Sequence, residues 1–255
     1  MFNKDSTGGT IGVALALCIV CSVLVSTAAV MLKPAQTANK AMDFKRNILL
    51  AAGLYEPGKD IEEQFGQVTT KLVDLDTGKF TEVAEGTERY DQRKASKDTS
   101  RSVGLSGGDD IAKIKRRVNV AKVYLVEGAD GVETVILPVK GYALWSTMYG
   151  FLALGSDLNT VVGLGFYEHA ETPGLGGEID NPNWKALFEG KKVYKEDGDI
   201  GLTVVKGSAP QGSDYLIDGL SGATLTSKGV DNMIKFWLGE QGFAGFLKNL
   251  KNGEA

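Results

Sequence analysis

The chain begins with a long apolar segment. Residues 11–32 hold no charged side chain, and most of them are Val, Leu, Ile, Ala or Cys. At about 1.5 Å per residue, this segment forms a helix of roughly 33 Å, enough to cross a hydrocarbon core of roughly 30 Å. The alternative is a cleaved signal peptide, whose apolar region usually spans only about 7–15 residues. We therefore expect a short tail over residues 1–10 and a transmembrane helix over residues 11–32.

The charges that flank this segment do not settle its orientation. Lys4 stands before it, whereas Lys33, Lys40, Lys45 and Arg46 follow it. A positive-inside count would place the C-terminal side in the cytoplasm, but large domains cross membranes largely regardless of charge. The side of the membrane stays open at this point.

The rest of the chain alternates between strand-like and helix-like patterns. Residues 38–54 and 56–66 read as short helical segments, and residues 68–75 alternate apolar and polar positions as a half-buried strand does. Residues 85–117 are polar and charged, which predicts a surface excursion. Further segments dense in Val, Leu and Tyr predict strands at 118–127, 132–139, 160–167 and 202–206.

Two helices are expected among these later strands, at 183–188 and 227–238. The second carries an apolar stripe at helical spacing, formed by Val230, Met233, Ile234, Trp237 and Leu238. This order of elements predicts an α+β domain with a twisted antiparallel or mixed sheet and flanking helices. We expect residues 33–117 to supply connecting helices, a strand and the charged excursion, and residues 118–255 to form the core.

Composition removes several classes of function. The chain has 28 Lys and Arg against 32 Asp and Glu, a formal charge of −4, which gives no general grip on nucleic acid. A single histidine, His169, excludes His-rich zinc sites and weakens any Ser-His-Asp proposal. The two cysteines, Cys18 and Cys21, lie in the apolar segment and read as small hydrophobic residues. The glycine motifs of dinucleotide and P-loop sites are missing, so a soluble nicotinamide dehydrogenase is not expected.

Two segments rich in glycine and hydroxyl groups remain as candidate sites. Residues 168–177 pack glycines around one leucine and one threonine, so either a flat ligand approaches the backbone there or Pro173 makes an ordinary turn. Residues 218–227 precede the amphipathic helix and carry four hydroxyls. Helix capping needs one hydroxyl, whereas a phosphate at a helix N-terminus would use several.

These segments resemble known signatures. Residues 218–224 read Asp-Gly-Leu-Ser-Gly-Ala-Thr and resemble the D-x-x-[ST]-G-A-T flavinylation motif of the FMN-binding domain family. Residues 171–176 resemble the second signature of that family. The apolar segment, the long stretch before Val118 and residues 140–147 are similar to the C subunits of the sodium-translocating NADH:quinone reductase (Nqr) family. The G subunit of the related Rnf complex shares both motifs but is usually shorter before them.

The resemblance implies a covalent cofactor within the 118–255 core. In this family a separate flavin transferase, which uses FAD and Mg²⁺, attaches FMN through its phosphate to the last motif threonine, here Thr224. The other motif positions expected near the phosphate are Asp218, Ser221, Gly222 and Ala223, together with Thr226 just after the motif.

The flavin ring needs flat or apolar cover and a few hydrogen bonds. Leu175 and Trp145 are the candidates for cover, although Trp145 could instead be a core residue. Glu171 and Thr172 are candidates for hydrogen bonds to the flavin. Gly176, in the segment 171–176, and Thr147, in the segment 140–147, are also expected at the site. Lys206 could compensate the phosphate or a reduced flavin, or could be an ordinary surface lysine.

The function implied is that of an electron relay. The chain would pass electrons between redox centres, with no catalytic residue and no metal site of its own. NADH oxidation, quinone reduction and sodium transport would belong to the membrane-embedded, flavin and iron–sulfur subunits of the complex. The family places such a domain on the periplasmic side of the bacterial inner membrane. The alternatives are an electron carrier like the G subunit of the Rnf complex, a membrane-anchored FMN-binding sensor and an anchored scaffold without redox function.

Overall fold

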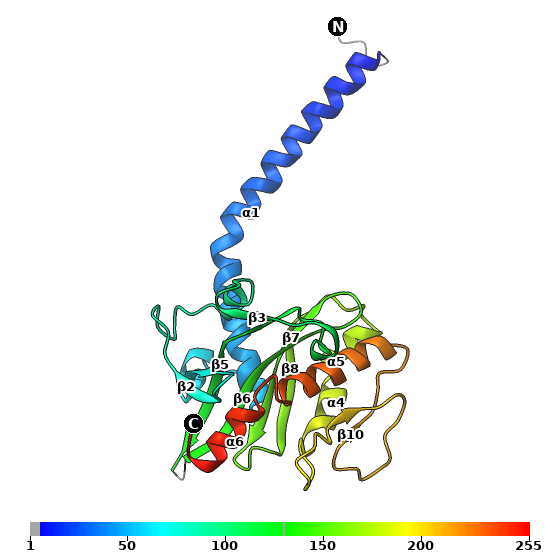
Figure 1. Cartoon of the computed structure of the whole chain (residues 1–255). Coiled ribbons are helices and arrows are strands. Elements are labelled where there is room, and N and C mark those ends of the chain that lie inside the picture. Colours follow the sequence, from blue (N-terminus) through cyan, green and yellow to red (C-terminus); the bar gives the residue numbers. More distant parts are fainter. Residues whose placement is uncertain (1–5, 130) are drawn as a thin grey trace. The chain divides into compact units, whose positions relative to one another are not determined.

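The computed structural model describes residues 6–129 and 131–255. The chain divides into two compact units, residues 1–43 and 44–255. The first consists mostly of helix α1, which spans Thr7–Ala51 and continues into the second unit (Figure 1). In the described part of the chain, α1 is the one helix long and apolar enough to cross a membrane, with a mean hydropathy of 2.6 in its best window. None of the residues of this window is buried within the chain, as a single-pass anchor in lipid requires.

Helix α1 is longer than the sequence pattern predicts. The pattern predicts two helices, over residues 11–32 and 38–54, but one helix runs through both. Pro34 lies inside it and removes a single backbone hydrogen bond. The Thr37 hydroxyl donates to the Lys33 carbonyl at 2.9 Å in the same turn. The residues around Pro34 are good helix formers, so one proline does not end the helix.

The second unit is built on a six-stranded antiparallel sheet. Its strand order is β2-β1-β5-β6-β7-β8, and every neighbouring pair is antiparallel. The strands are β1 (Val68–Asp74), β2 (Lys79–Thr81), β5 (Val120–Gly128), β6 (Gly131–Tyr142), β7 (Thr147–Gly155) and β8 (Val161–Glu168). The predicted α+β class with an antiparallel sheet is therefore confirmed.

Shorter elements surround this sheet. Between β2 and β5 lie α3 (Gln92–Ala95), η1 (Gly107–Asp109) and the hairpin of β3 (Ser102–Gly104) and β4 (Arg116–Val118), with α2 (Ile61–Phe65) before β1. After β8 come η2 (Gly176–Asp180), α4 (Pro182–Lys185), η3 (Ala186–Phe188), the parallel pair β9 (Thr203–Val204) and β10 (Leu216–Ile217), α5 (Thr224–Trp237) and α6 (Ala244–Asn252). The excursion predicted over residues 85–117 therefore contains short ordered elements.

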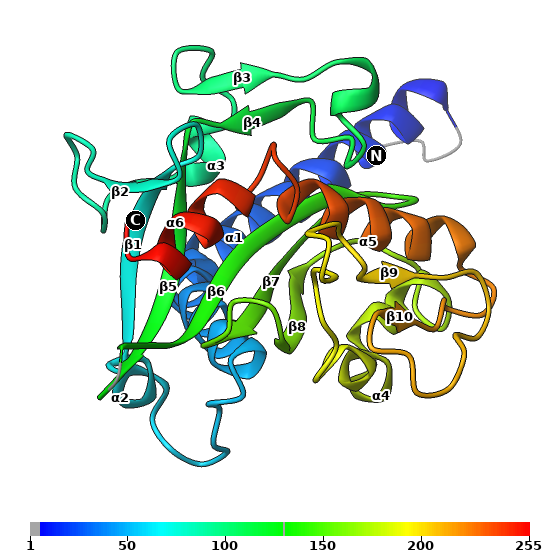
Figure 2. The same cartoon turned by 60° about the horizontal axis from the view of Figure 1, so that its bottom comes forward.

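The two faces of the sheet are covered by different helices. Helix α5 packs on one face, where Met233 and Trp237 are fully buried with Leu137 (Figure 2). The C-terminal end of α1 packs on the other face, where Ile48 is buried with Phe151. Alternate residues along β6 thus serve two separate apolar cores, as the period of a strand dictates.

Two glycines hold α5 close to the end of β6. A Cβ atom on Gly141 of β6 would lie 2.7 Å from the Met233 Cβ, and one on Gly229 of α5 would lie 2.8 Å from the Ala143 Cα. The Trp237 indole N–H donates to the Lys140 carbonyl at 2.7 Å. This close packing sets where the first turn of α5 lies.

We expect Gly141→Ala to lower the free energy of unfolding by about 1–3 kcal/mol, because the added methyl overpacks the contact with Met233. Gly165→Ala in β8 is the matched control, since its Cβ would meet no atom within 4 Å. That change should stay within about 0.5 kcal/mol. Urea unfolding in detergent, followed by tryptophan fluorescence, measures both. Equal effects would contradict the close packing of α5 on β6.

Candidate functional site

The first turn of α5 presents the motif threonine to solvent. Thr224 is the first residue of the helix and is exposed. Gly222, two residues earlier, has φ +73°, which favours glycine and lets the chain turn into the helix. In the described part of the chain, no hydrogen bond involves the side-chain hydroxyls of Thr224 or Ser221. The free amides of a helix N-terminus lie beside them, which suits an anion.

The remaining two hydroxyls of this segment are engaged within the fold. The Ser227 hydroxyl accepts the Leu220 N–H at 2.8 Å and donates to the Ala223 carbonyl at 3.2 Å. The Thr226 hydroxyl is buried and donates to Glu171 Oε2 at 2.7 Å. The four hydroxyls therefore divide into two that shape the loop and two that remain available.

Glu171 joins the two motif segments. Its side chain is buried, and its second oxygen, Oε1, accepts the Trp145 backbone N–H at 2.9 Å. A Cβ on Gly176 would lie 2.5 Å from Thr226 Oγ1 and 2.7 Å from Glu171 Oε2, so only glycine fits there. One carboxylate thus connects the turn between β6 and β7, the loop after β8 and the first turn of α5.

Exposed apolar side chains surround this junction. Leu175 is 47 % exposed, and its Cδ2 would lie 3.2 Å from a Cβ on Gly222. Trp145 is 63 % exposed, so it is not a core residue. Leu225, next to Thr224, is also exposed. These three side chains, Trp145, Leu175 and Leu225, form what we call the apolar rim.

Three of the expected residues have backbone or anchoring roles. The Thr172 carbonyl accepts the N–H groups of Leu175 and Gly177 at 3.1 and 2.8 Å, while its side chain is exposed. Asp218 Oδ1 accepts the Ala209 N–H at 2.7 Å, so this carboxylate fixes the loop between β9 and β10. Thr147 is the first residue of β7 and is half-buried.

Positive charge lies next to Thr224. A cavity of about 60 Å³ is lined by Lys206, Thr224, Ser227 and Lys228, among others. The Lys228 amino group is 3.3 Å from Asp231, a buried carboxylate that Lys235 also contacts. The Lys206 amino group has no hydrogen bond or ion pair in the described residues. Both Lys206 and Lys228 line the cavity that Thr224 also lines, so their charges favour an anion at that position.

Lys228 was not among the residues expected at this site. A signal was available in the sequence, because residues four apart share one face of a helix, which aligns Lys228 with Thr224.

His169 has a structural role. Its Nε2 is 2.7 Å from Asp180 Oδ2, and its Nδ1 accepts the Glu171 N–H at 3.2 Å. It therefore supports the loop that holds Glu171. Across residues 6–129 and 131–255, no group of three His, Cys, Asp or Glu side chains could hold a metal ion.

Comparisons with known proteins agree on one family. Residues 143–239 match the FMN-binding domain model. The chain is 53 % identical to the C subunit of the Na⁺-translocating NADH-quinone reductase of Pseudomonas aeruginosa, over 100 % of both chains. It is 51 % identical to the same subunit of Vibrio alginolyticus, over 99 % of this chain and 98 % of that one.

Two solved structures are similar as well. The crystal structure of Shewanella oneidensis NqrC has a TM-score of 0.77 at 36 % identity, over 84 % of this chain and 99 % of that one. The C subunit of the Na⁺-translocating NADH-quinone reductase from Parabacteroides distasonis has a TM-score of 0.62 at 27 % identity, over 86 % and 96 % of the two chains.

The link through Glu171 can be measured by a double-mutant cycle. With Glu171→Ala and Thr226→Val, we expect a coupling free energy of about 1–2 kcal/mol, because a buried hydrogen bond to a charged group is lost once and not twice. The control cycle is Arg93→Ala with Glu168→Ala, an exposed ion pair at 2.9 Å that should couple by less than about 1 kcal/mol. Urea unfolding provides both values, and a Glu171 coupling no larger than the control would contradict its role.

Proposed function

Because the chain belongs to the family of C subunits of Na⁺-translocating NADH-quinone reductases, we propose that it holds FMN covalently on Thr224 and relays electrons within that complex. The observation that supports this most directly is the Thr224 hydroxyl, exposed at the start of α5 next to two lysines. The complex performs the enzymatic reaction, and no catalytic residue is assigned to this chain.

The residues present fit a phosphate linked to Thr224. The hydroxyl is accessible, the helix N-terminus supplies amide donors, and Lys206 and Lys228 line the adjacent cavity. Ser221 lies three residues before Thr224, is exposed, and can donate a hydrogen bond to a phosphate oxygen. Thr224 Oγ1 would hold the FMN phosphate as an ester after transfer from FAD, with AMP as the leaving group and the hydroxyl proton released. The flavin transferase supplies the donor and Mg²⁺.

The apolar rim fits the flavin ring. Trp145, Leu175 and Leu225 offer exposed apolar surface near the attachment point, and bound FMN supplies one-electron chemistry there. Glu171 has both oxygens engaged and is buried, so its part is to position the rim and Thr226. Electron relay requires no proton transfer by the chain, so we assign no general base to it.

We place the domain on the periplasmic side of the inner membrane. Both cysteines of the chain lie within α1, so residues 52–255 hold no thiol that an oxidising compartment would modify. Partners in this placement are the other subunits of the reductase, the flavin transferase and membrane lipid. The full-length match to C subunits favours this family over a carrier of the Rnf type or a sensor.

Thr224→Ala should abolish the flavin that stays on the chain after denaturation, because the attaching oxygen is gone. The chain is produced in a host with the transferase and read by in-gel fluorescence. Thr224→Ser should retain labelling, since its hydroxyl can form the same ester.

The control for this test is Ser221→Ala, which should weaken labelling less than Thr224→Ala. Mass spectrometry of the flavin-bearing peptide then identifies the residue. FMN on Ser221 or Thr226 in the native chain would contradict attachment at Thr224, and flavin released by denaturant from every sample would falsify covalent binding.

The side of the membrane can be tested by cysteine labelling. In a background with Cys18→Ala and Cys21→Ala, Thr99→Cys at an exposed loop position should react with an impermeant thiol reagent in intact spheroplasts. Ser6→Cys, before the membrane-spanning segment, should react only after lysis. The reverse pattern would place the domain in the cytoplasm.

A further inference from the structure

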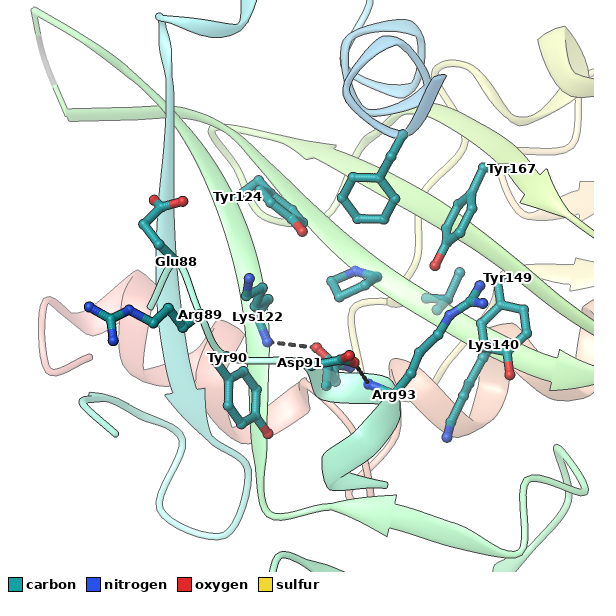
Figure 3. A pocket seen from close by; sticks show the side chains of 14 residues that line it. Glu88, Arg89, Tyr90, Asp91, Arg93, Lys122, Tyr124, Lys140, Tyr149 and Tyr167 are labelled. Atoms are coloured by element: carbon teal, nitrogen blue, oxygen red, sulfur yellow. Dashed lines mark hydrogen bonds between the residues drawn. The ribbon is translucent and has the colours of Figure 1, made fainter. Parts of the chain in front are cut away.

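A second and larger cavity lies on the sheet face that does not carry α5. Its volume is about 430 Å³, within the range of about 300–1,000 Å³ that small-molecule sites occupy. Strands β5 to β8 form its floor, and residues 88–93, leading into α3, form one wall (Figure 3). It shares no lining residue with the cavity beside Thr224, and it lies on the opposite face of the sheet from α5, the helix that Thr224 begins.

Aromatic rings line the floor of this cavity. The Phe44 ring packs edge-on against Tyr124 and Tyr167, with centroids 6.2 and 5.1 Å apart. Tyr149 lies 6.2 Å from Tyr167. Burial raises the pKa of Tyr124 and Tyr167, so both phenols keep their protons and can donate hydrogen bonds. The floor therefore offers flat apolar surface edged by neutral donors.

Arg93 is fixed at the edge of this floor. Its guanidinium lies 3.7 Å from the centroid of the Tyr149 ring and 5.4 Å from that of Tyr167. Two hydrogen bonds, of 2.9 and 3.1 Å, connect it to the Glu168 carboxylate. Its charge is thus already matched, and it serves as a wall.

Lys122 and Lys140 bring charge that is not matched. In the described residues, neither amino group has an ion pair. Burial lowers the pKa of Lys140 to about 8, with Arg93 adding to the effect and Asp110 opposing it. Burial also lowers the pKa of Lys122, against the weaker attraction of Glu88 and Asp91.

The acidic groups nearby do not neutralise these lysines. The Asp91 carboxylate accepts the backbone N–H groups of Arg93 and Lys94 and pairs with the Lys94 amino group at 3.5 Å. Glu88 also lines the cavity, but it forms no ion pair with Lys122 or Lys140 in the described residues and only weakly offsets the effect of burial on Lys122 (Figure 3). Two half-buried lysines therefore share a cavity without an ion-pair partner among the described residues, an arrangement that a bound anion stabilises.

We propose that this cavity binds a small planar aromatic anion, whose ring lies on Tyr124, Tyr149 and Tyr167 and whose anionic group pairs with Lys122 and Lys140. A neutral aromatic molecule would leave both ammonium groups unpaired. A small inorganic anion would leave the tyrosine surface uncovered. The proposal is independent of the flavin at Thr224.

The probe for the test is 2-naphthoate, which stays ionised throughout the relevant pH range. Isothermal titration of the full chain in detergent should show binding at pH 7, with the neutral 2-naphthamide and with acetate each at least about tenfold weaker. Lys140→Met and Lys122→Met should each weaken 2-naphthoate about tenfold, because each removes one charge-assisted contact. Lys79→Met, at an exposed position of β2, is the matched control and should change nothing.

Proton uptake on binding provides a second test. A lysine with only a structural role would not take up a proton when the anion binds. Lys140 loses its proton above about pH 8 in the free chain, and a bound carboxylate raises that pKa. Titration at pH 8.5 in buffers of different ionisation enthalpy should therefore show protons taken up on binding, and affinity should fall as pH rises further. Lys140→Arg should keep the affinity and lose the Lys140 share of this uptake.

The outcomes decide the proposal clearly. Equal affinity for 2-naphthoate and 2-naphthamide, or unchanged affinity in both Lys→Met variants, would overturn it. Binding to the isolated chain but not to the assembled reductase would mean that a neighbouring subunit fills the cavity, and would also overturn the assignment. Retained FMN labelling and an unchanged near-ultraviolet circular dichroism spectrum establish that each variant is folded.

Discussion

The geometry of the proposed flavin site depends on one buried carboxylate. Glu171 accepts a hydrogen bond from the Trp145 backbone and another from the Thr226 hydroxyl, and it is almost fully removed from solvent. A buried carboxylate is costly unless such donors surround it. The turn between β6 and β7, the loop after β8 and the first turn of α5 must therefore pack together in the fold. His169 adds a further constraint by accepting the Glu171 N–H. The position of Thr224 relative to Trp145 and Leu175 follows from this junction.

Strand β6 connects the position of α5 to the opposite face of the sheet. Gly141 and Gly229 bring α5 into direct contact with the end of β6, and the Trp237 indole bonds to the carbonyl of Lys140. The side chain of Lys140 points to the opposite face, where it lines the larger cavity with the tyrosine floor. One strand thus carries the helix of the flavin motif on one face and an unmatched charge on the other. The two sites share a rigid platform without sharing a residue that binds in both.

How much the sequence reveals depends on whether the relevant physics is local. The apolar helix was predictable from the length of its uncharged run, and β1 and the stripe of α5 were predictable because each has a clear period. Strand β7 was missed, because it is an interior strand buried on both faces, so its residues do not alternate, and Gly150 interrupts them. Gly150 is required there by close contact with the carbonyl of Gly165 in the next strand, which no local pattern reveals. The motif residues followed from resemblance, but the bond between Glu171 and Thr226 joins positions 55 apart and needed the fold.

A covalent link changes what the rest of a cofactor site has to provide. The cavity beside Thr224 measures about 60 Å³, whereas sites that enclose a ligand of flavin size usually measure about 300–1,000 Å³. Such a cavity can take a phosphate group but cannot surround a three-ring system. In the proposed arrangement the ring would rest on exposed side chains, and the covalent link to Thr224 would keep it there at high local concentration without many contacts. An enclosed site would suit a substrate that needs exclusion of water. A ring held in the open suits exchange of electrons with a partner surface, and the exposed side chains of Trp145, Leu175 and Leu225 fit the proposed arrangement.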